Sequence, residues 1–593
     1  MAHFKVNERD IFFILKDQLS YGKLCALDRY RELDEATMDM LVTEIIKFSR
    51  LEIDPLQEIG EKWGGVLEEG QVRCAPEFKR AFKTCAENGW IAVARDHTYG
   101  GQGFPYMMRM IQTEMMSGAA QSFGVLGLTH GAGHLIENFA TDDLKELFVP
   151  RMYSGQWAGT MALTEPNAGS NLAGLRTTAY REGDHFKIKG NKMFISYGDH
   201  DLTKNIIHLL LARIEGAPEG IKGISLFIVP KIRVNPDGSL GEPNDVQCTG
   251  IEKKLGMHAK PTCALSFGEN DGCIGYLCGE ENRGLAHMFQ MMNAARIASG
   301  ITGMTLASSA YLHALQYAKE RIQGSDVARR KDGYVPIIDH PDVRRMLLWM
   351  KAMVDGMRSM CYTDALWEDY AHELSNEEER QHYQALLDFM TPIVKTYCAE
   401  MGTQVTMTAM QVHGGYGYCE EYHVAQYLRD GKAASLYEGT SGIQSMDLMG
   451  RKMQINGGAP YKAFMSEINK FIDRYFDHPV LGKEIGFLSN VVKRLSDVAA
   501  EMLEKYKSDP LQWASSTYPV LLCFGDVTVT WRLLDIAIAA QRNIDEGEND
   551  EFFVGKIKQA TYFTDVTLPL TMARLETCLR KGREIIEIPD AAF

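Results

Sequence analysis

The sequence predicts a mainly α-helical protein with a small antiparallel β domain between two helical blocks and a further helical bundle at the C-terminal end. Apolar residues recur with a helical period before about residue 157 and again after about residue 284. Between these blocks, short β-rich runs are bounded by glycine, proline or charge, which is typical of strands and turns. We therefore divide the chain into four parts, 1–159, 160–283, 284–456 and 457–593.

The composition is that of an ordinary globular chain. Its 593 residues suffice for about three or four domains, and the 45% of hydrophobic residues can form a large core. The net charge of -15 disfavours nucleic acid as a partner, because phosphate binding requires basic patches. Twelve scattered cysteines without CxxC pairs indicate reduced thiols. The sequence shows neither the apolar core of a signal peptide nor a membrane span, so we predict a cytoplasmic protein.

The first helical block contains a clear amphipathic helix and a glycine-rich loop. Apolar residues between Met38 and Ile46 recur at helical spacing, and Asp34 can cap the start of this helix. Pro55 disturbs its far end. The paired glycines of DHTYGGQGFP, residues 96–105, predict a loop.

The β domain begins where the period changes, near Trp157. The stretch RTTAYREGDHFKIKGNKMFIS alternates in polarity, and Glu182-Gly183-Asp184 forms the expected turn between two strands. The runs NIIHLLLARI, GISLFIVPKI and TCALSF are also short, rich in β-formers and bounded by Gly, Pro or charge. These runs together predict a compact antiparallel domain.

Helical periodicity returns at about Gly284 and continues to about Met453. INGGAPY, residues 455–461, predicts a linker because glycines and a proline interrupt the pattern. Four helical patterns follow, around 464–475, 487–498, 517–541 and 552–580. They predict an appended helical bundle.

Two segments of the β domain could contact a cofactor. MALTEPNAGSNLAG, residues 161–174, ends a strand in a Gly-Ser turn whose N–H groups and hydroxyls suit a flavin edge or a phosphate. The alternative is a surface turn that only connects strands. KMFIS places Phe194 and Ser196 on one face of a strand, where they could pack against a flavin ring and bond its edge. The alternative is an ordinary half-buried strand.

The glycine-rich and histidine motifs are weak when taken singly. QVHGGYGY, residues 411–418, lacks GxGxxG spacing and follows no strand. Its glycines would let the backbone approach a cofactor closely, but the same turn could simply end a helix. His130 and His134 in HGAGH lack the Glu of HExxH, so we expect no metal site there. The sequence contains neither a GxSxG elbow nor a P-loop.

SLYEGTSGIQ, residues 435–444, holds the carboxylate of Glu438 between an aromatic residue and a Gly-Thr pair. The simplest interpretation of this acid is a solvated residue on a turn, since buried glutamates are rare unless they are paired. The alternative is a base aimed at a substrate. The ten residues alone favour the solvated acid, and the other motifs change this interpretation.

In this order the segments resemble the acyl-CoA dehydrogenase family of flavoproteins over residues 80–455. TEPNAGSN resembles the family's TEPGAGSD, MFIS its WIT, and YAKERIQG its YxxxRxxFG. QVHGGYGY resembles the family's QxxGGxGY, and YLRDGKAASLYEGT its RDxxxxxIYEGT. Gly442 stands where many shorter members have Gln, which puts one side-chain contact to the cofactor in doubt. Asn167, Asn171, Phe194 and Ser196 replace the family's Gly, Asp, Trp and Thr.

Other segments resemble one branch of the family. ISYGDHDLTKNIIHLLLARI, GMHAKPTCALSF, HPDVRRML and the C-terminal bundle resemble its long bacterial members. That branch includes methylthiopropanoyl-CoA dehydrogenases and broad-range fatty acyl-CoA dehydrogenases.

The resemblance implies FAD-dependent α,β-dehydrogenation of an acyl-CoA thioester to the 2-enoyl-CoA, as in fatty acid β-oxidation. In most of the family the Glu of YEGT is the catalytic base, and Glu438 occupies that place. It would take the α-proton while the β-hydride passes to flavin N5. The Glu438 N–H and a flavin ribityl hydroxyl would hold the thioester carbonyl. A carboxylate buried against Tyr437 should have a raised pKa, which makes it a better base.

The resemblance also implies contact residues and partners. FAD would be contacted by Met161, Leu163, Thr164, Phe194, Ser196, Arg321, Gln411, Gly414, Gly415 and Thr440. The CoA thioester would be contacted by Ser170, Asn293, Arg296 and Gly439. The implied partners are an acyl-CoA, an electron-transferring flavoprotein that accepts the electrons, and further copies of the chain in a homodimer or homotetramer.

Three alternatives keep the fold and change the function. An acyl-CoA oxidase would return the electrons to oxygen, and the loop contacts that decide this are not visible in a sequence. A DNA-binding relative, as a non-catalytic module, should carry a basic patch in residues 460–593, where both signs are mixed. A desulfinase relative should have lost the glutamate that this chain retains as Glu438. The sequence does not predict which acyl group is bound, because the depth of its pocket depends on where residues such as Met115 and Ser299 lie in space.

Overall fold

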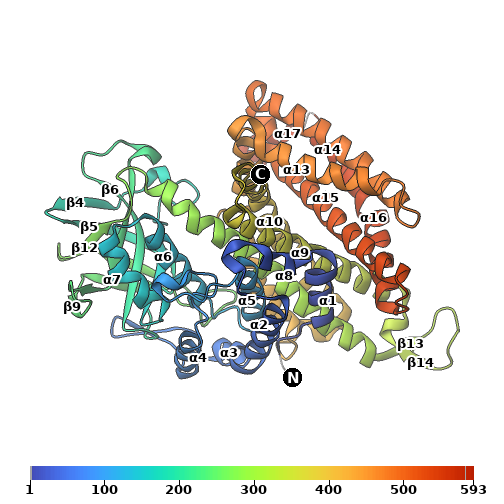
Figure 1. Cartoon of the computed structure of the whole chain (residues 1–593), viewed down its shortest axis with the longest axis horizontal. Coiled ribbons are helices and arrows are strands. Elements are labelled where there is room, and N and C mark those ends of the chain that lie inside the picture. The colour runs from blue at the N-terminus through green and yellow to red at the C-terminus, as the bar shows by residue number, and fades with distance from the viewer. Residues whose placement is uncertain (1–2, 581–582) are drawn as a thin grey trace. The chain divides into compact units, whose positions relative to one another are not determined.

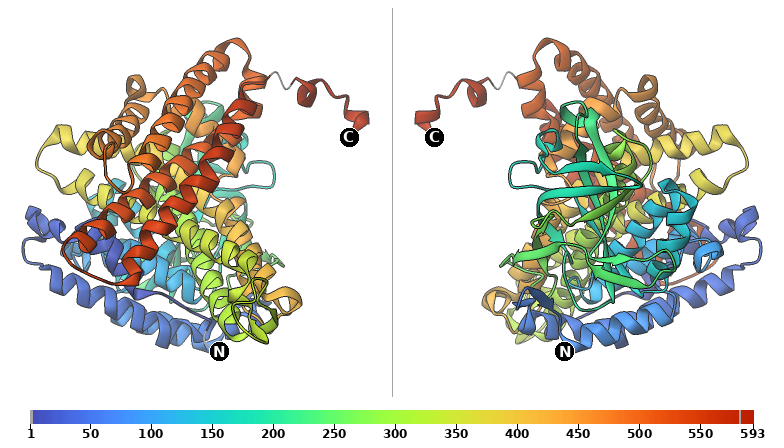
Figure 2. Two further views of the ribbon diagram at one scale, coloured as in Figure 1. Left: turned by 90° about the vertical axis from the view of Figure 1, so that its right-hand side faces the viewer. Right: turned by 90° about the vertical axis from the view of Figure 1, so that its left-hand side faces the viewer.

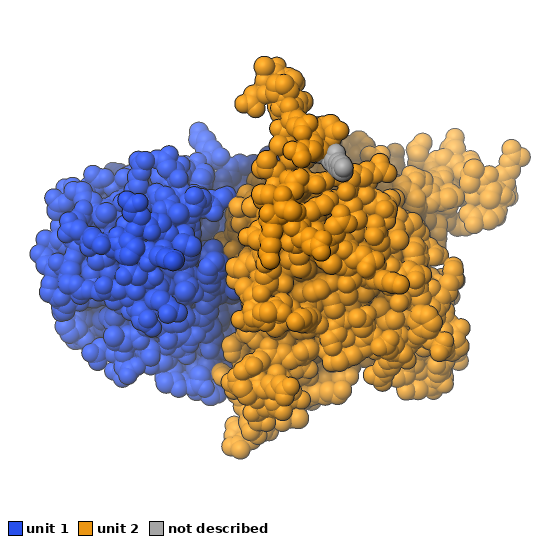
Figure 3. All heavy atoms as spheres, turned by 90° about the horizontal axis from the view of Figure 1, so that it is seen from above, with its two compact units in different colours: residues 1–4, 41–295 blue, residues 5–40, 296–593 orange. Residues whose placement is uncertain are grey.

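The computed structural model describes residues 3–580 and 583–593. The order of helices and strands confirms the predicted fold class, which is mainly helical with a central sheet (Figure 1). The chain forms two compact units, coloured in Figure 3. Unit 1 comprises residues 1–4 and 41–295, and unit 2 comprises residues 5–40 and 296–593. The four-part division by sequence stays a prediction.

The helices longer than one turn are described first. Their bounds are α1 (Glu8–Phe13), α2 (Glu35–Phe48), α3 (Pro55–Trp63), α4 (Pro76–Glu87), α5 (Tyr106–Ala119), α6 (Val125–Phe139), α7 (Asp142–Tyr153), α8 (Gly284–Glu320), α9 (Pro341–Glu373), α10 (Glu377–His413), α11 (Val424–Lys432), α12 (Ser441–Met446), α13 (Ile455–Tyr475), α14 (Gly482–Ser508), α15 (Pro510–Asp545) and α16 (Glu551–Cys578). A short helix, α17 (Glu584–Glu587), follows.

The strands are short, as the sequence predicts. Their bounds are β1 (Val66–Glu68), β2 (Gln71–Arg73), β3 (Trp157–Ala162), β4 (Thr178–Glu182), β5 (His185–Ser196), β6 (Asn205–Ile214), β7 (Ile224–Pro230), β8 (Ile232–Val234), β9 (Leu240–Pro243), β10 (Val246–Ile251), β11 (Thr262–Phe267), β12 (Ile274–Leu277), β13 (Ile322–Ser325) and β14 (Tyr334–Pro336).

The start of α2 follows the predicted capping. The Thr37 N–H donates to Asp34 Oδ1 at 2.7 Å, which satisfies one of the donors that a helix leaves unpaired at its N-terminus. The helix ends at Phe48, a π-helical turn follows, and Pro55 then begins α3. Proline suits this first helical position, because its missing N–H would have no intrahelical partner there.

The central sheet is mixed, whereas the sequence predicted an antiparallel one. Strand β3 pairs with β6 in parallel, from Trp157 opposite Asn205 to Ala162 opposite Leu210. The β4–β5 hairpin fills the crossover between these two strands, and its turn at Glu182-Gly183-Asp184 is confirmed by the pairing of Glu182 with His185. Strand alternation reports which face is buried and not the direction of the neighbour. The parallel pairing is therefore visible only in the structure.

Strand β6 is buried on both faces, which explains its continuous apolar run. Ile207 and Leu209 belong to the core that α6 and α7 share with the sheet, whose strands are drawn in teal and green in the right-hand view of Figure 2. Leu210 and Ala212 face a second core, which includes Phe186 and lies within the β domain. Strand β6 thus contributes to two cores, one on each of its faces.

Unit 2 is a helical body in which α15 occupies the centre of the C-terminal helices. It packs against α9, α10, α12, α14 and α16. It is apolar on nearly all sides, and a helix of this kind is a buried one. The predicted linker is short, because only Asn456, Gly457 and Gly458 leave the helical conformation inside α13. Within the described ranges, no helix combines the length and apolar character needed to cross a membrane.

Candidate active site

The YEGT segment forms a strained turn in unit 2, which we call the Glu438 turn and define as residues 437–440. It lies between a short 3₁₀ segment after α11 and the start of α12. Glu438 has a φ of 57° and Gly439 a φ of 87°. Left-handed backbone is natural for glycine but uncommon for a glutamate. Such a conformation persists only where surrounding contacts hold it, and these positions cluster at functional sites.

Two buried side chains hold consecutive carbonyls of the Glu438 turn. Gln444, from α12, donates from Nε2 to the Glu438 carbonyl oxygen at 2.9 Å. Lys395, from α10, donates from Nζ to the Gly439 carbonyl oxygen at 2.6 Å. Neither Gln444 nor Lys395 is exposed. The turn ends at Thr440, whose hydroxyl oxygen accepts from the Ile443 N–H at 3.3 Å and caps α12.

Tyr437 anchors the other side of the turn to α8. Burial raises the pKa of Tyr437 to about 12, and the charge of Glu438 acts in the same direction. Hydrogen bonds with Ser299 and Thr302 of α8 act in the opposite direction. The phenol therefore stays neutral near pH 7 and bonds to hydroxyls.

Two buried cations accompany the turn. Arg296, from α8, lies 3.6 Å from Asp447 Oδ2 through Nη1. Burial lowers the pKa of the Arg296 guanidinium, whereas Asp447 and Glu438 act to raise it. Burial lowers the pKa of Lys395 to about 8, with Glu438 and Glu400 opposing this shift. The charge of Glu438 thus acts on two cations, Arg296 and Lys395, that lie far from it in sequence.

A second predicted cluster in unit 2 lies where α8 and α10 end. Tyr317 of α8 stacks on His413 of α10 with ring centroids 4.5 Å apart. The Arg321 guanidinium carbon lies 5.9 Å from the centroid of the Tyr416 ring. Arg321, Gln411, Gly414 and Gly415 are all exposed. A Cβ on either glycine would meet no atom within 4 Å, so this backbone faces open space.

The flavin-contact candidates of unit 1 gather at the end of β3 and on β5. Met193 donates its N–H to the Thr164 carbonyl at 2.9 Å, which joins the two segments. The register of β5 against β11 shifts beside Phe194, which has a φ of 59°. This irregularity leaves Phe194 56% exposed, while Ile195 is buried. Ser196, two residues further along, is half-buried.

The remaining candidates of unit 1 are less closely grouped. Met161 and Thr164 are half-buried, and Leu163 is buried in the core. Ser170 is exposed on the turn after β3, and Asn293 is half-buried on α8.

Profiles of one enzyme family match the chain from residue 36 onward. The N-terminal domain of acyl-CoA dehydrogenase matches residues 36–156 and the middle domain residues 160–269. The C-terminal domain matches residues 282–453, and a profile described as acetyl-CoA dehydrogenase C-terminal like matches residues 464–589. The chain belongs to the acyl-CoA dehydrogenase family. This membership confirms the resemblance of the motifs and places the chain among oxidoreductases.

Several members of the acyl-CoA dehydrogenase family match this chain along its whole length. The 3-methylmercaptopropionyl-CoA dehydrogenase of Ruegeria pomeroyi is 37% identical over 95% of this chain and 96% of its own. A butyryl-CoA dehydrogenase of Syntrophomonas wolfei is 35% identical over 100% of both. The broad-specificity linear acyl-CoA dehydrogenase FadE5 of Mycobacterium tuberculosis is 32% identical over 100% of both.

Solved structures share the fold of this acyl-CoA dehydrogenase. Caenorhabditis elegans ACDH-11 in complex with C11-CoA superposes with a TM-score of 0.76 at 19% identity, covering 99% of this chain and 93% of its own. A Bacillus anthracis acyl-CoA dehydrogenase complexed with FAD has a TM-score of 0.73 at 22% identity, covering 95% and 90%.

Glu165, in the acyl-CoA dehydrogenase TEP motif, has a structural role in unit 1. Its Oε1 accepts from Lys192 Nζ at 2.8 Å and from the Thr177 hydroxyl at 2.5 Å. Its Oε2 accepts from the Arg176 N–H at 2.6 Å. Burial alone would raise the pKa of Glu165, but Lys192 and these hydrogen bonds hold it below its ordinary value. A carboxylate engaged in this way is a poor proton acceptor.

The histidines of HGAGH have local partners in this acyl-CoA dehydrogenase. His130 Nδ1 lies 3.0 Å from the Ile91 carbonyl oxygen, and His134 contacts Gln290. Across the residues that the structure describes, no group of three or more His, Cys, Asp or Glu side chains could hold a metal ion. Lys395, which bonds to the Glu438 turn from α10, is the main residue of the candidate site that sequence reasoning missed. Its one signal was a lysine within the apolar run TPIVKTYCA.

Proposed function

We propose that this chain catalyses the α,β-dehydrogenation of an acyl-CoA thioester, with Glu438 as the base. The observation that carries this proposal is the left-handed backbone of Glu438, where Gln444 holds the Glu438 carbonyl and Lys395 the carbonyl of the next residue. Strain of this kind orients a functional group at a defined place. The family supplies the reaction class, and the turn supplies a positioned carboxylate.

The residues of the turn have distinct tasks in this mechanism. The Glu438 carboxylate accepts the proton from the α-carbon. Negative charge then develops on the thioester carbonyl, and the backbone N–H of Glu438 is the proposed donor for that oxygen. Tyr437, tied to Ser299 and Thr302, fixes the start of the turn. Bound FAD would supply the acceptor for the β-hydride.

The exposed groups of each unit suit a flavin cofactor. Phe194 presents an aromatic ring at an irregularity of β5, and Ser196 of the same strand and Thr164 of the adjoining segment carry hydroxyls. Gly414 and Gly415 present backbone without side chains to open space. We propose that these residues hold FAD, together with Met161, Leu163, Arg321, Gln411 and Thr440. Ser170, Asn293, Arg296 and Gly439 are the proposed contacts of the CoA thioester.

The proposed acyl group is short and linear, with or without a thioether. Two relatives that match nearly the full chain are named for butyryl-CoA and 3-methylmercaptopropionyl-CoA. The acyl group is identified by assaying a panel of thioesters with an artificial electron acceptor. The panel comprises propanoyl, butanoyl, methylthiopropanoyl, longer linear and cyclic thioesters.

Further proposals rest on family membership: an electron-transferring flavoprotein as the electron acceptor, a homodimer or homotetramer, and a cytoplasmic location. Stoichiometric peroxide release in air would indicate the oxidase instead.

The substitution Glu438→Gln tests the base directly. Glutamine is nearly isosteric, so folding, FAD content and acyl-CoA binding should persist. The proton acceptor is lost, and loss of a general base costs about 10²- to 10⁴-fold in rate. Stopped-flow absorbance at the flavin bands should show spectral perturbation by the thioester without bleaching.

Glu421→Gln is the matched control, because Glu421 is an exposed glutamate that lies before α11 and outside the Glu438 turn. It should bleach at the wild-type rate. If Glu438→Gln bleaches within tenfold of the wild type, Glu438 is not the base.

A further inference from the structure

Lys395 is a buried lysine whose ammonium group ends on the Glu438 turn. It lies inside α10, and its side chain has no exposed surface. Its Nζ donates to the Gly439 carbonyl oxygen at 2.6 Å. Burying an ammonium group is costly unless it is paired and hydrogen-bonded. The position therefore requires an explanation beyond packing.

Holding a carbonyl does not by itself require a cation. The neighbouring carbonyl of Glu438 is held by the neutral amide of Gln444, at 2.9 Å and equally buried. A neutral donor therefore suffices for the same task one residue away. The charge of Lys395 exceeds what the backbone geometry needs.

The groups that face Lys395 identify the purpose of its charge. Two carboxylates, Glu438 and Glu400, favour its charged form, and the cation of Arg296 opposes it. Glu400 has other partners, since it accepts from the Ser441 hydroxyl at 2.5 Å and lies 4.0 Å from Lys432 Nζ. The hydrogen bond of Lys395, by contrast, goes to the residue that follows Glu438.

We propose that Lys395 is a positioning residue that fixes the Glu438 turn and provides a counter-charge for the Glu438 carboxylate. This inference rests on the proposed function. Before proton transfer, the cation favours the ionised base. By holding the Gly439 carbonyl, it also helps keep the Glu438 N–H in the orientation proposed for the thioester oxygen.

The test compares Lys395→Met, which removes charge and donor, with Lys395→Arg, which keeps both. An opposite charge near a carboxyl lowers its pKa by about one unit or more, so its removal should raise the pKa of the base. The acid limb of the kcat/KM profile should move up by about one pH unit in the Met variant, which is about a tenfold loss below that limb. The Arg variant should keep the acid limb of the kcat/KM profile at its wild-type pH.

A binding measurement separates positioning from charge without turnover when both the reference protein and the Met variant also carry Glu438→Gln, which removes the proton acceptor. The Met variant should bind an acyl-CoA thioester more weakly than the reference protein. It should bind the thioether analogue, which has CH₂ in place of the carbonyl, equally well. Isothermal titration calorimetry with both ligands measures this difference in affinity. Lys452→Met is the matched control, because it removes another buried lysine of unit 2, one that pairs with Asp388 at 2.5 Å.

The outcomes are distinct. A folded Met variant with an unchanged acid limb and unchanged preference for the thioester would show that Lys395 is merely structural. If the Met variant does not fold, Lys395→Gln, which keeps a polar donor without charge, is tested instead. It is measured in the same two assays, the pH profile of kcat/KM and the calorimetric titration. If the wild type oxidises no thioester of the panel, the proposed function fails, whatever Lys395 does.

Discussion

At the scale of single residues, two glutamates of the family motifs differ in their partners. Glu165 lies in a closed network with Lys192 and two backbone N–H groups. Glu438 lies on a left-handed turn whose carbonyls, and not its carboxylate, take the hydrogen bonds of Gln444 and Lys395. The first arrangement stabilises an ion within a fold, and the second suits the positioned base that we propose.

We expect Glu165→Gln to reduce stability and to leave proton abstraction intact. Removing one member of a buried ion pair costs about 3–5 kcal/mol, because Lys192 would remain buried without its counter-ion. The folded pKa of Glu165 is depressed, so its stabilisation is present above the ordinary pKa of about 4.3 and is lost as the pH falls. Urea unfolding at pH 7 and pH 4 measures both effects.

The control for this change is Glu182→Gln, an exposed glutamate of the β4–β5 turn. It should leave the unfolding free energy nearly unchanged, because exposed ion pairs contribute little to stability. Loss of flavin bleaching in a folded Glu165→Gln protein would reverse the assignment of roles.

At the scale of elements, the C-terminal helices support the helix that carries Lys395. Tyr397, two residues along α10, donates its hydroxyl to Asp526 Oδ1 of α15 at 2.7 Å. Asp526 Oδ2 accepts from Arg574 Nη1 and Thr571 Oγ1 of α16, at 2.6 Å and 2.9 Å. The network therefore links α10, α15 and α16. The C-terminal helices are thus joined by hydrogen bonds to α10, the helix from which Lys395 contacts the Glu438 turn.

Tyr397→Phe should destabilise unit 2 by about 1–3 kcal/mol, because it leaves a buried carboxylate oxygen without one of its donors. Tyr461→Phe is the matched control, since its hydroxyl bonds to the neutral Ser496 Oγ at 3.0 Å. We expect the larger fall in melting temperature for Tyr397→Phe. Equal shifts in the two variants would argue against the network as a support of α10.

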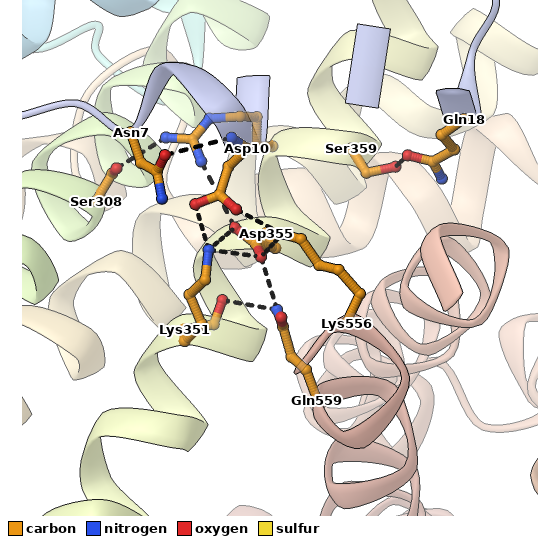
Figure 4. A network of polar contacts seen from close by, with 10 residues as sticks. Asn7, Asp10, Gln18, Ser308, Lys351, Asp355, Ser359, Lys556 and Gln559 are labelled. Carbon is orange, nitrogen blue, oxygen red and sulfur yellow. Dashed lines mark hydrogen bonds and ion pairs between the residues drawn. The ribbon is translucent and has the colours of Figure 1, made fainter. Parts of the chain in front are cut away.

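At the scale of the whole unit, distant parts of the chain meet in one buried ionic network (Figure 4). Lys556 Nζ of α16 lies 2.7 Å from Asp10 Oδ1 of α1 and 2.6 Å from Asp355 Oδ2 of α9. Lys351 contacts the same two carboxylates. Burial alone would raise the pKa of Asp355, but Lys351, Lys556 and Arg358 hold it well below its ordinary value. The N-terminal segment and the last long helix are joined through α9.

Lys556→Met should lower the stability of unit 2 by about 3–5 kcal/mol and make it more sensitive to acid. The stabilisation from Asp355 is present above its ordinary pKa of about 3.9 and is lost as the pH falls, and losing a cation raises its folded pKa. The acid midpoint of unfolding, followed by circular dichroism, should therefore move to higher pH. Lys558→Met, at an exposed position of the same helix, should leave both values unchanged. An unaltered acid midpoint in Lys556→Met would contradict this account.

The sequence by itself determined the features that depend on local pattern. Capping by Asp34, the turn at Gly183 and the C-terminal helices follow from residue type and period, which act over a few residues. The family followed from motifs in a fixed order, and so did the prediction that Glu438 is the base. Amino-acid patterns report which face of an element is buried, because burial acts on each side chain separately.

Only the tertiary structure decided which residues share an environment. The parallel pairing of β3 with β6 and the approach of Lys395 to Gly439 join segments that lie dozens of residues apart. The same holds for the ion pair that makes Glu165 structural. A hydrogen bond or a charge interaction depends on distance in space, and the sequence pattern around each partner carries no information about the other. The roles of these residues therefore became visible only when the chain was folded.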